Sequence, residues 1–291
     1  MRRAFYYLLT ALAAAAQPAS EGRIEKLSGG HEFASTVAWS SREGFLLIGD
    51  APAGRITRID EKGKSVFRDS LPAAGLAVDE DGRVYACDSR GRQVIRLDKK
   101  NKTDVVASDW EGKKFNGPSD IAVLKKDHVY FTDPAFGSAD TTKELAHYGI
   151  YHVGPKGELS AVAKLAARPN GITVSPDGKT LYATVADERS VLSWMLDKNG
   201  VATQQRIFAS GIDGVPDGID VAPDGRVFVA ARALLVYSGD GKLLSTQPVP
   251  EKPVDIALGE ADLNTVFIAA GSNVYRFRLP AELQNKTGAR H

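Results

Sequence analysis

The sequence has a single cysteine, almost no net charge and no long hydrophobic run beyond its N-terminus. Cys87 is the only cysteine among 291 residues, so no disulfide can form within the chain. Cys87 ends the apolar run VYAC, and this position predicts that its thiol is buried in the core and is not a reactive nucleophile. The 37 Lys and Arg residues balance 36 Asp and Glu residues, which excludes the basic excess typical of nucleic-acid binding.

The N-terminus has the three regions of a secretory signal. Two arginines follow Met1, an uncharged apolar stretch (AFYYLLTALAAAA) fills residues 4–16, and small and polar residues come next. This pattern predicts a signal peptide at residues 1–16, with cleavage after Ala16 or up to about residue 20. A membrane-anchoring or plain N-terminal helix is the alternative. We expect an exported protein, periplasmic or extracellular, with no membrane association after cleavage.

One motif of a short apolar strand, a turn and a second apolar strand occurs six times. The copies are VAWSSREGFLLIGD (37–50), LAVDEDGRVYACD (76–88), IAVLKKDHVYFTD (121–133), ITVSPDGKTLYATVAD (172–187), IDVAPDGRVFVAAR (219–232) and IALGEADLNTVFIAA (256–270). Asp-Gly pairs in three copies supply the positive φ angles that tight hairpins need. We therefore interpret these aspartates as turn residues and not as acid or base groups.

The period of the motif predicts the architecture. Equivalent first-strand residues recur in steps of about 40 to 50 residues, each with room for four strands, as in a β-propeller blade. They are Trp39, Val78, Val123, Val174, Val221 and Leu258. The last unit ends early, and residues 23–27 are available to complete it. The sequence predicts an all-β, six-bladed β-propeller as a single closed domain over residues 23–280, followed by a polar tail at residues 281–291.

Functional side chains of a propeller are expected at one mouth of the channel, just before each first strand. Four residues ahead of the first-strand positions stand Ser35, Ala74, Ser119, Asn170, Asp217 and Val254. Asn170 and Asp217 carry oxygen donors of the kind that Ca²⁺ prefers, with Ser35 and Ser119 as weaker candidates. The alternative is that Asn170 and Asp217 only satisfy backbone groups at strand starts.

The same mouth holds the residues just after each second strand, which are Asp50, Asp88, Asp133, Asp187 and Arg232. We interpret the aspartates at 50, 88 and 187 as turn residues. Asp133 differs because it precedes a long insertion, PAFGSADTTKELAHY (134–148), placed like a substrate lid. Asp133, Phe136, His147 and Arg232 are therefore candidate substrate contacts. His147 is also a candidate general base, with an ordinary surface role as the alternative.

Four segments together resemble the gluconolactonase and regucalcin-like (SMP-30) family. They are PSDIAVLKKDHVYFTDPAFG (118–137), PNGITVSPDGKTLYAT (169–184), PDGIDVAPDGRVFVA (216–230) and PVDIALGEADLNTVFIA (253–269). The similarity runs through essentially the whole predicted mature chain. It implies a six-bladed propeller that hydrolyses lactones or related small esters, with a divalent cation, usually Ca²⁺, in the channel.

The resemblance also implies roles for individual residues. Asn170 and Asp217 match two metal ligands of the family, and Asp217 is the implied catalytic base. Ser119 stands where the family has an Asn that serves metal or substrate. Ser35 stands where the family has a Glu ligand, and Glu32 lies three positions too early unless a local bulge returns it to the channel. These replacements should weaken cation binding, because affinity depends on ligand charge and number.

Two hypotheses follow. In the first, the chain is an exported, monomeric hydrolase of a small-molecule lactone or ester, with a divalent cation polarising the carbonyl and Asp217 assisting the attack of water. In the second, it is a non-catalytic propeller that binds a small ligand or a protein partner at a degenerate metal site.

Overall fold

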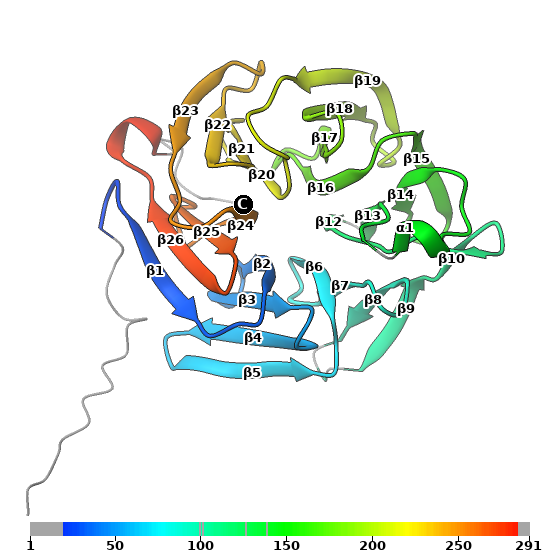
Figure 1. Cartoon of the computed structure of the whole chain (residues 1–291), viewed down its shortest axis with the longest axis horizontal. Coiled ribbons are helices and arrows are strands. Elements are labelled where there is room, and N and C mark those ends of the chain that lie inside the picture. Colours follow the sequence, from blue (N-terminus) through cyan, green and yellow to red (C-terminus); the bar gives the residue numbers. More distant parts are fainter. Residues whose placement is uncertain (1–19, 99, 101, 126, 138, 285–291) are drawn as a thin grey trace, which may run out of the picture.

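The computed structural model shows six four-stranded antiparallel sheets arranged as blades around a central channel (Figure 1). The structure describes residues 20–284 except 99, 101, 126 and 138, so the predicted signal peptide lies outside the described residues. In blades 1 to 5, strands that follow one another in the sequence are neighbours and the first of them lies innermost, whereas blade 6 adds the N-terminal strand as its outermost member. The predicted six-bladed all-β propeller is confirmed.

Blades 1 to 3 are formed by consecutive strands. Blade 1 contains β2 (Ala34–Ser40), β3 (Phe45–Asp50), β4 (Arg55–Asp60) and β5 (Gly63–Asp69). Blade 2 contains β6 (Ala73–Val78), β7 (Val84–Asp88), β8 (Gln93–Leu97) and β9 (Thr103–Ala107). Blade 3 contains β12 (Ile121–Leu124), β13 (His128–Asp133), β14 (Tyr148–Val153) and β15 (Leu159–Leu165). A short hairpin between blades 2 and 3 is formed by β10 (Asp109–Trp110) and β11 (Lys113–Lys114).

Blades 4 and 5 repeat this order, and blade 6 ends the series. Blade 4 contains β16 (Pro169–Val174), β17 (Thr180–Val185), β18 (Ser190–Leu196) and β19 (Ala202–Ala209). Blade 5 contains β20 (Ile219–Val221), β21 (Val227–Ala230), β22 (Leu234–Tyr237) and β23 (Leu243–Gln247). Blade 6 contains β24 (Pro253–Gly259), β25 (Thr265–Ala270), β26 (Asn273–Arg278) and the N-terminal strand β1 (Ile24–Gly29).

Among the described residues between 20 and 284, helical structure is limited to single turns. They are α1 (Ala139–Thr142), within the insertion between β13 and β14, and the 3₁₀ turn η2 (Ala281–Leu283) after β26. In the part of the chain that the structure describes, no helix has the length and apolar character needed to cross a membrane.

Strand β1 closes the ring. It pairs antiparallel with β26, with Ile24 opposite Phe277 and Gly29 opposite Asn273. The prediction that residues 23–27 complete the last unit is therefore confirmed. Because the first and last segments of the ring share one sheet, blade 6 ties the two ends of the ring together, and β1 covers the edge of β26.

The apolar core is divided into layers between neighbouring blades. The second strands β3, β13 and β25 are buried along their whole length, because each is covered by a blade on both faces. Between blades 6 and 1, the rings of Trp39 and Phe267 stack with centroids 5.3 Å apart. Cys87 is fully buried between blades 2 and 3, and burial raises the pKa of its thiol, which confirms the predicted core role.

The first strands approach one another so closely that several positions require glycine, among them Gly171 and Gly218. A Cβ atom on Gly171 would lie 2.3 Å from the carbonyl oxygen of Asp217 in the next blade. A Cβ atom on Gly218 would lie 2.2 Å from Oδ1 and 2.6 Å from Cα of Asp255. The Asp217 carbonyl oxygen and the Asp255 Cα are main-chain atoms that cannot rotate away, so any side chain here must displace a neighbouring blade.

We expect Gly218→Ala to lower the free energy of unfolding by about 1–3 kcal/mol, because the new methyl group forces blades 5 and 6 apart. Gly117→Ala is the matched control, since no atom lies within 4 Å of the added Cβ, and its change should stay within about 0.5 kcal/mol. Urea denaturation measures both. Equal stability of the two variants would contradict this account of the blade contact.

Candidate functional site

Three polar side chains meet at the starts of three successive first strands. Ser119 precedes β12, Asn170 lies in β16 and Asp217 precedes β20. The Ser119 hydroxyl donates to Asn170 Oδ1 at 3.2 Å, and Asn170 Nδ2 donates to Asp217 Oδ1 at 2.6 Å. The structure thus brings together these three residues from blades 3, 4 and 5. We call them the Ser119–Asn170–Asp217 cluster.

The Asp217 carboxyl is shielded from much of the solvent and lies near the negative charge of Asp255. Burial raises the pKa of Asp217 to about 7, and the charge of Asp255 also raises it. The charge of Lys252 and the hydrogen bond from Asn170 act in the opposite direction. A carboxyl group with this pKa can accept and release a proton near neutral pH, which is the property required of a general base.

Three further aspartates, which the sequence analysis did not select, line the channel wall around a cavity of about 210 Å³. Asp120 Oδ2 accepts the N–H of Ile172 at 2.8 Å, and Asp220 Oδ2 accepts the N–H of Leu258 at 2.7 Å. Asp255 Oδ2 accepts the N–H of Val37 at 2.9 Å. Each bond crosses a blade boundary. The sequence signal for these inter-blade bonds was an aspartate within, or directly before, the apolar residues of a first strand.

Among the described residues, neither first-blade candidate, Glu32 or Ser35, makes a hydrogen bond to Asn170 or Asp217. A register shift between Ala34 and Thr36 places a bulge at Ser35, yet Glu32 stays exposed. Ser35 Oγ donates to the Phe33 carbonyl at 3.2 Å and accepts the N–H of Ala51 at 3.1 Å, so its hydroxyl is engaged locally. The contacts of both candidates are with their own loop and not with Asn170 or Asp217.

Asp50 and Asp88 have the predicted turn role, since they accept the N–H groups of Ala53 and Gly91, whereas Asp187 instead bonds and ion-pairs with Arg168 on the preceding loop. Asp50 also accepts the N–H groups of residues 32 and 33. Each carboxylate stabilises a loop at the channel mouth. Their recurrence after the second strands follows from the repeated geometry of these loops.

The structure does not support the prediction that Asp133 contacts a substrate. Its side chain is fully buried, and its two oxygens accept the N–H groups of Asn116 at 2.9 Å and Gly117 at 2.8 Å. Burial raises the pKa of Asp133 to about 7, while these two hydrogen bonds lower it. The carboxyl anchors the loop that leads into blade 3, so it is not open to a substrate.

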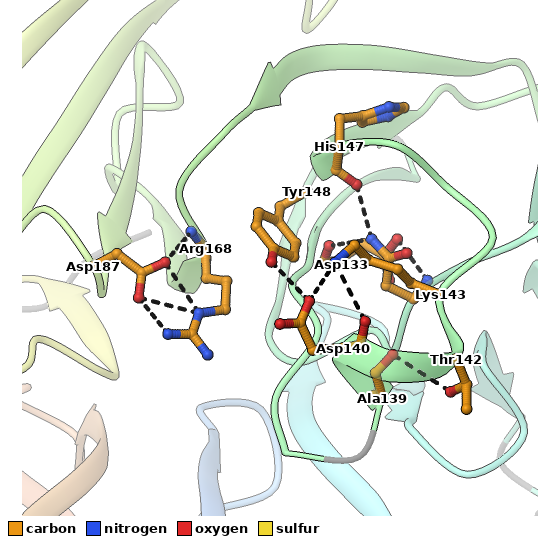
Figure 2. A network of polar contacts seen from close by, with 10 residues as sticks. Asp133, Ala139, Asp140, Thr142, Lys143, His147, Tyr148, Arg168 and Asp187 are labelled. Atoms are coloured by element: carbon orange, nitrogen blue, oxygen red, sulfur yellow. Dashed lines mark hydrogen bonds and ion pairs between the residues drawn. The ribbon is translucent and has the colours of Figure 1, made fainter.

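His147 lies in the insertion but points away from the polar contacts around Asp140 (Figure 2). Its Nε2 atom is 3.0 Å from the Tyr151 hydroxyl, and burial and the charge of Lys164 lower the pKa of its imidazole. The structure therefore does not bring His147 to Asp217. The rest of the insertion is held by Asp140, which accepts a hydrogen bond from Tyr148 at 2.8 Å (Figure 2).

Phe136 and Arg232 remain at the rim. The Phe136 ring is 40% exposed and lies 5.3 Å from the guanidinium of Arg168, two residues before Asn170. Arg168 is fixed by its ion pair with Asp187 (Figure 2). Arg232 is exposed, lies 3.7 Å from Asp213 and lines a cavity of about 390 Å³ that Lys252 also lines.

The donor set of the cluster suits a hard cation. Within the described residues, no group of three or more His, Cys, Asp or Glu side chains could hold a metal ion. The cluster instead offers one carboxylate, one amide oxygen and one hydroxyl, all of them oxygen donors. Ca²⁺ takes such ligands, but it takes six to eight, so at most half could come from these side chains.

These features define a class of protein: six-bladed propellers with a carboxylate–amide cluster at the channel mouth. A family model described as SMP-30/Gluconolactonase/LRE-like region matches residues 33–272, and the chain belongs to this family. A gluconolactonase from Zymomonas mobilis is 30% identical over 288 residues, covering 88% of this chain and 81% of its own sequence.

Solved structures agree with this assignment. A gluconolactonase from Xanthomonas campestris superposes with a TM-score of 0.82 at 28% identity, covering 89% of this chain and 90% of its own. A regucalcin from Agrobacterium tumefaciens, described as calcium-binding, has a TM-score of 0.72 at 16% identity, with coverage of 86% and 90%. The second likeness concerns the fold alone. Membership in this family supports a lactone hydrolase.

We expect the channel aspartates to make the protein more stable at mildly acidic pH. Burial raises the pKa of Asp220 to about 6, so the folded state holds this proton more tightly than the unfolded state. The stabilisation is complete below the unfolded pKa of about 4 and is lost as the pH rises through the folded pKa. Asp220→Asn should reduce the difference in unfolding free energy between pH 5 and pH 8 by about 1–3 kcal/mol.

Chemical denaturation at both pH values, with a chelator present, measures this difference. Asp224→Asn is the control, because Asp224 lies in the turn between β20 and β21 and its side chain bonds only nearby residues of that turn. An unchanged pH dependence in Asp220→Asn would show that this carboxyl does not bind a proton more tightly on folding.

Proposed function

We propose that this protein hydrolyses a lactone or a related small ester at the Ser119–Asn170–Asp217 cluster, with Asp217 as the general base. One observation supports this most strongly. Asp217 combines a pKa raised to about 7 with a 2.6 Å hydrogen bond to Asn170, at the channel mouth of a protein from a family that includes gluconolactonases.

The proposed reaction adds water across the ring ester bond. Deprotonated Asp217 accepts a proton from water while the water oxygen bonds to the carbonyl carbon. The bond from that carbon to the ring oxygen then breaks, and the proton passes to the departing oxygen, which gives a hydroxy acid. Asn170 orients the Asp217 carboxylate through the bond to Oδ1, and Ser119 fixes the Asn170 amide in turn.

We also propose that Asp217, Asn170 and Ser119 hold a divalent cation of the Ca²⁺ type, with the remaining ligands from water or substrate. When bound, such a cation supplies Lewis-acid polarisation of the substrate carbonyl. The all-oxygen donor set supports this assignment. The regucalcin structure described as calcium-binding offers support from a protein of the same fold.

The rim residues would contact the substrate outside the reacting bond. Phe136 offers an exposed apolar ring, and Arg232 offers a guanidinium beside the loop that leads to Asp217. We further propose that the chain acts as an exported monomer on a small molecule, as the signal-like N-terminus suggests.

The alternative, a non-catalytic ligand-binding propeller, is favoured by the first blade. Among the described residues, neither Glu32 nor Ser35 hydrogen-bonds to Asn170 or Asp217, and a serine stands where the resemblance implies a carboxylate. A site of this kind could bind a polar ligand without activating water. Turnover of a lactone panel by the purified protein separates the two functions.

We expect Asp217→Asn to lower kcat/KM for glucono-δ-lactone by about 100-fold or more, because the amide cannot accept the proton from water. Asp224→Asn, in a turn on the opposite face, should leave kcat/KM unchanged. A continuous pH-indicator assay of acid release measures both variants. Full activity in Asp217→Asn would rule out this residue as the base.

We expect kcat/KM to fall on acidification through about pH 7 when cations are removed by a chelator. The reason is that the base must be deprotonated and burial raises the pKa of Asp217 to about 7. Added Ca²⁺ should move this limb to lower pH, because a bound cation favours the ionised carboxylate. A pH–rate profile with and without Ca²⁺ tests this, and an acidic limb near pH 4 without cation would contradict it.

A further inference from the structure

Two buried threonines hold the main chain of the cluster from the preceding blades. Thr132 on β13 and Thr184 on β17 are both fully buried. The Thr132 hydroxyl donates to the carbonyl oxygen of Asn170 at 2.5 Å. The Thr184 hydroxyl donates to the carbonyl oxygen of Asp217 at 2.7 Å. Each threonine therefore bonds the backbone of a cluster residue that belongs to the next blade.

Each hydroxyl also accepts a hydrogen bond from its own blade. The N–H of Asp120 donates to Thr132 at 3.1 Å, and the N–H of Gly171 donates to Thr184 at 2.8 Å. The Asn170 carbonyl and the Gly171 N–H belong to one peptide unit, so both threonines bond to this same unit. It is thereby fixed from both sides.

The chain of hydrogen bonds continues into blade 6. The Asp217 carbonyl and the Gly218 N–H again share a peptide unit, and this N–H donates to the Val254 carbonyl at 2.8 Å. A continuous series of hydroxyl and peptide groups thus runs through blades 3, 4, 5 and 6. Hydrogen bonds in such a series polarise and strengthen one another, especially where water is excluded.

The distribution of threonine among the blades matches the location of the cluster. Strand pairing aligns one second-strand position across the blades, occupied by Gly49, Cys87, Thr132, Thr184, Ala230 and Ala269. A hydroxyl occurs in the two blades that precede Asn170 and Asp217. A general need of blade packing would apply at every boundary, and the other four blades pack with Gly, Cys or Ala.

We propose that Thr132 and Thr184 are positioning residues that fix the backbone of Asn170 and Asp217, so that the amide and the carboxylate converge. Neither threonine contacts the substrate. The catalytic consequence rests on the proposed function, whereas the effect on geometry rests on the hydrogen bonds alone. Displacing a catalytic group by about 1 Å can cost about 100-fold in rate, so small shifts of these peptide units matter.

Thr132→Val and Thr184→Val test this, because valine keeps the shape and removes the hydroxyl. Thr184→Ser restores a hydroxyl as the conservative variant. Thr265→Val is the matched control, because Thr265 is also a fully buried second-strand threonine whose hydroxyl donates a hydrogen bond, to Glu260 Oε2 at 2.6 Å, but at the start of β25 away from the cluster. All four proteins are compared by thermal melting and by steady-state hydrolysis of glucono-δ-lactone.

We expect Thr184→Val to lower kcat by about 10- to 100-fold with KM within about threefold, and Thr184→Ser to recover most of kcat. Thr132→Val should lower kcat in the same direction, through Asn170. The control should lose comparable melting temperature without this loss of kcat. A kcat loss in Thr184→Val no greater than that of the control, or no recovery in Thr184→Ser, would overturn the proposal.

Crystal structures of the substrate-free valine variants give a readout that needs no activity. We expect the contact between Asn170 Nδ2 and Asp217 Oδ1, 2.6 Å in the native chain, to lengthen beyond hydrogen-bonding distance in Thr184→Val. An unchanged contact would overturn the proposal. If the native protein hydrolyses no lactone, the proposed function fails, and these structures still decide whether the threonines position the cluster.

Discussion

The width of the channel is the constraint on which the rest of this structure depends. Six first strands converge on one axis, so their main chains meet across blade boundaries and must satisfy one another's polar groups. Gly171 and Gly218 allow this approach because no side chain could fit between the blades. Asp120 and Asp255 complete it by accepting N–H groups of the next blade. The ring is therefore closed by polar contacts at its centre and by apolar layers farther out.

The candidate site uses the same contacts that close the ring. Asn170 and Asp217 precede the two glycines, so the peptide units that join neighbouring blades also carry the amide and the carboxylate of the cluster. The burial that strengthens the inter-blade bonds also removes part of the hydration of the half-buried Asp217 carboxyl, and this desolvation raises its pKa to about 7. Stability of the ring and reactivity of the site thus have one physical origin.

Much of this was predictable from the sequence, because it depends on local pattern and on repetition. The Asp-Gly turns, the six repeats and the spare N-terminal strand predicted the closed propeller, and aligning the repeats brought Ser119, Asn170 and Asp217 together. The contacts of Asp133 and His147 were not predicted, because these residues interact with loops whose path the repeat does not specify. Thr132 and Thr184 passed unnoticed, since threonine is an ordinary strand residue and only its hydrogen-bond partners distinguish it.

The pairing of β1 with β26 has a consequence for how the protein is made. These strands lie about 250 residues apart in the sequence. Blade 6 therefore cannot be completed before β26 has left the ribosome. Until the final strand is synthesised, β1 has no partner and the sixth blade has an open edge that other strands could pair with. Contacts so distant in sequence also slow folding, because the chain must close a long loop before they form. β1 therefore precedes the other strands of the ring in the sequence, yet it is among the last to pair with its neighbour.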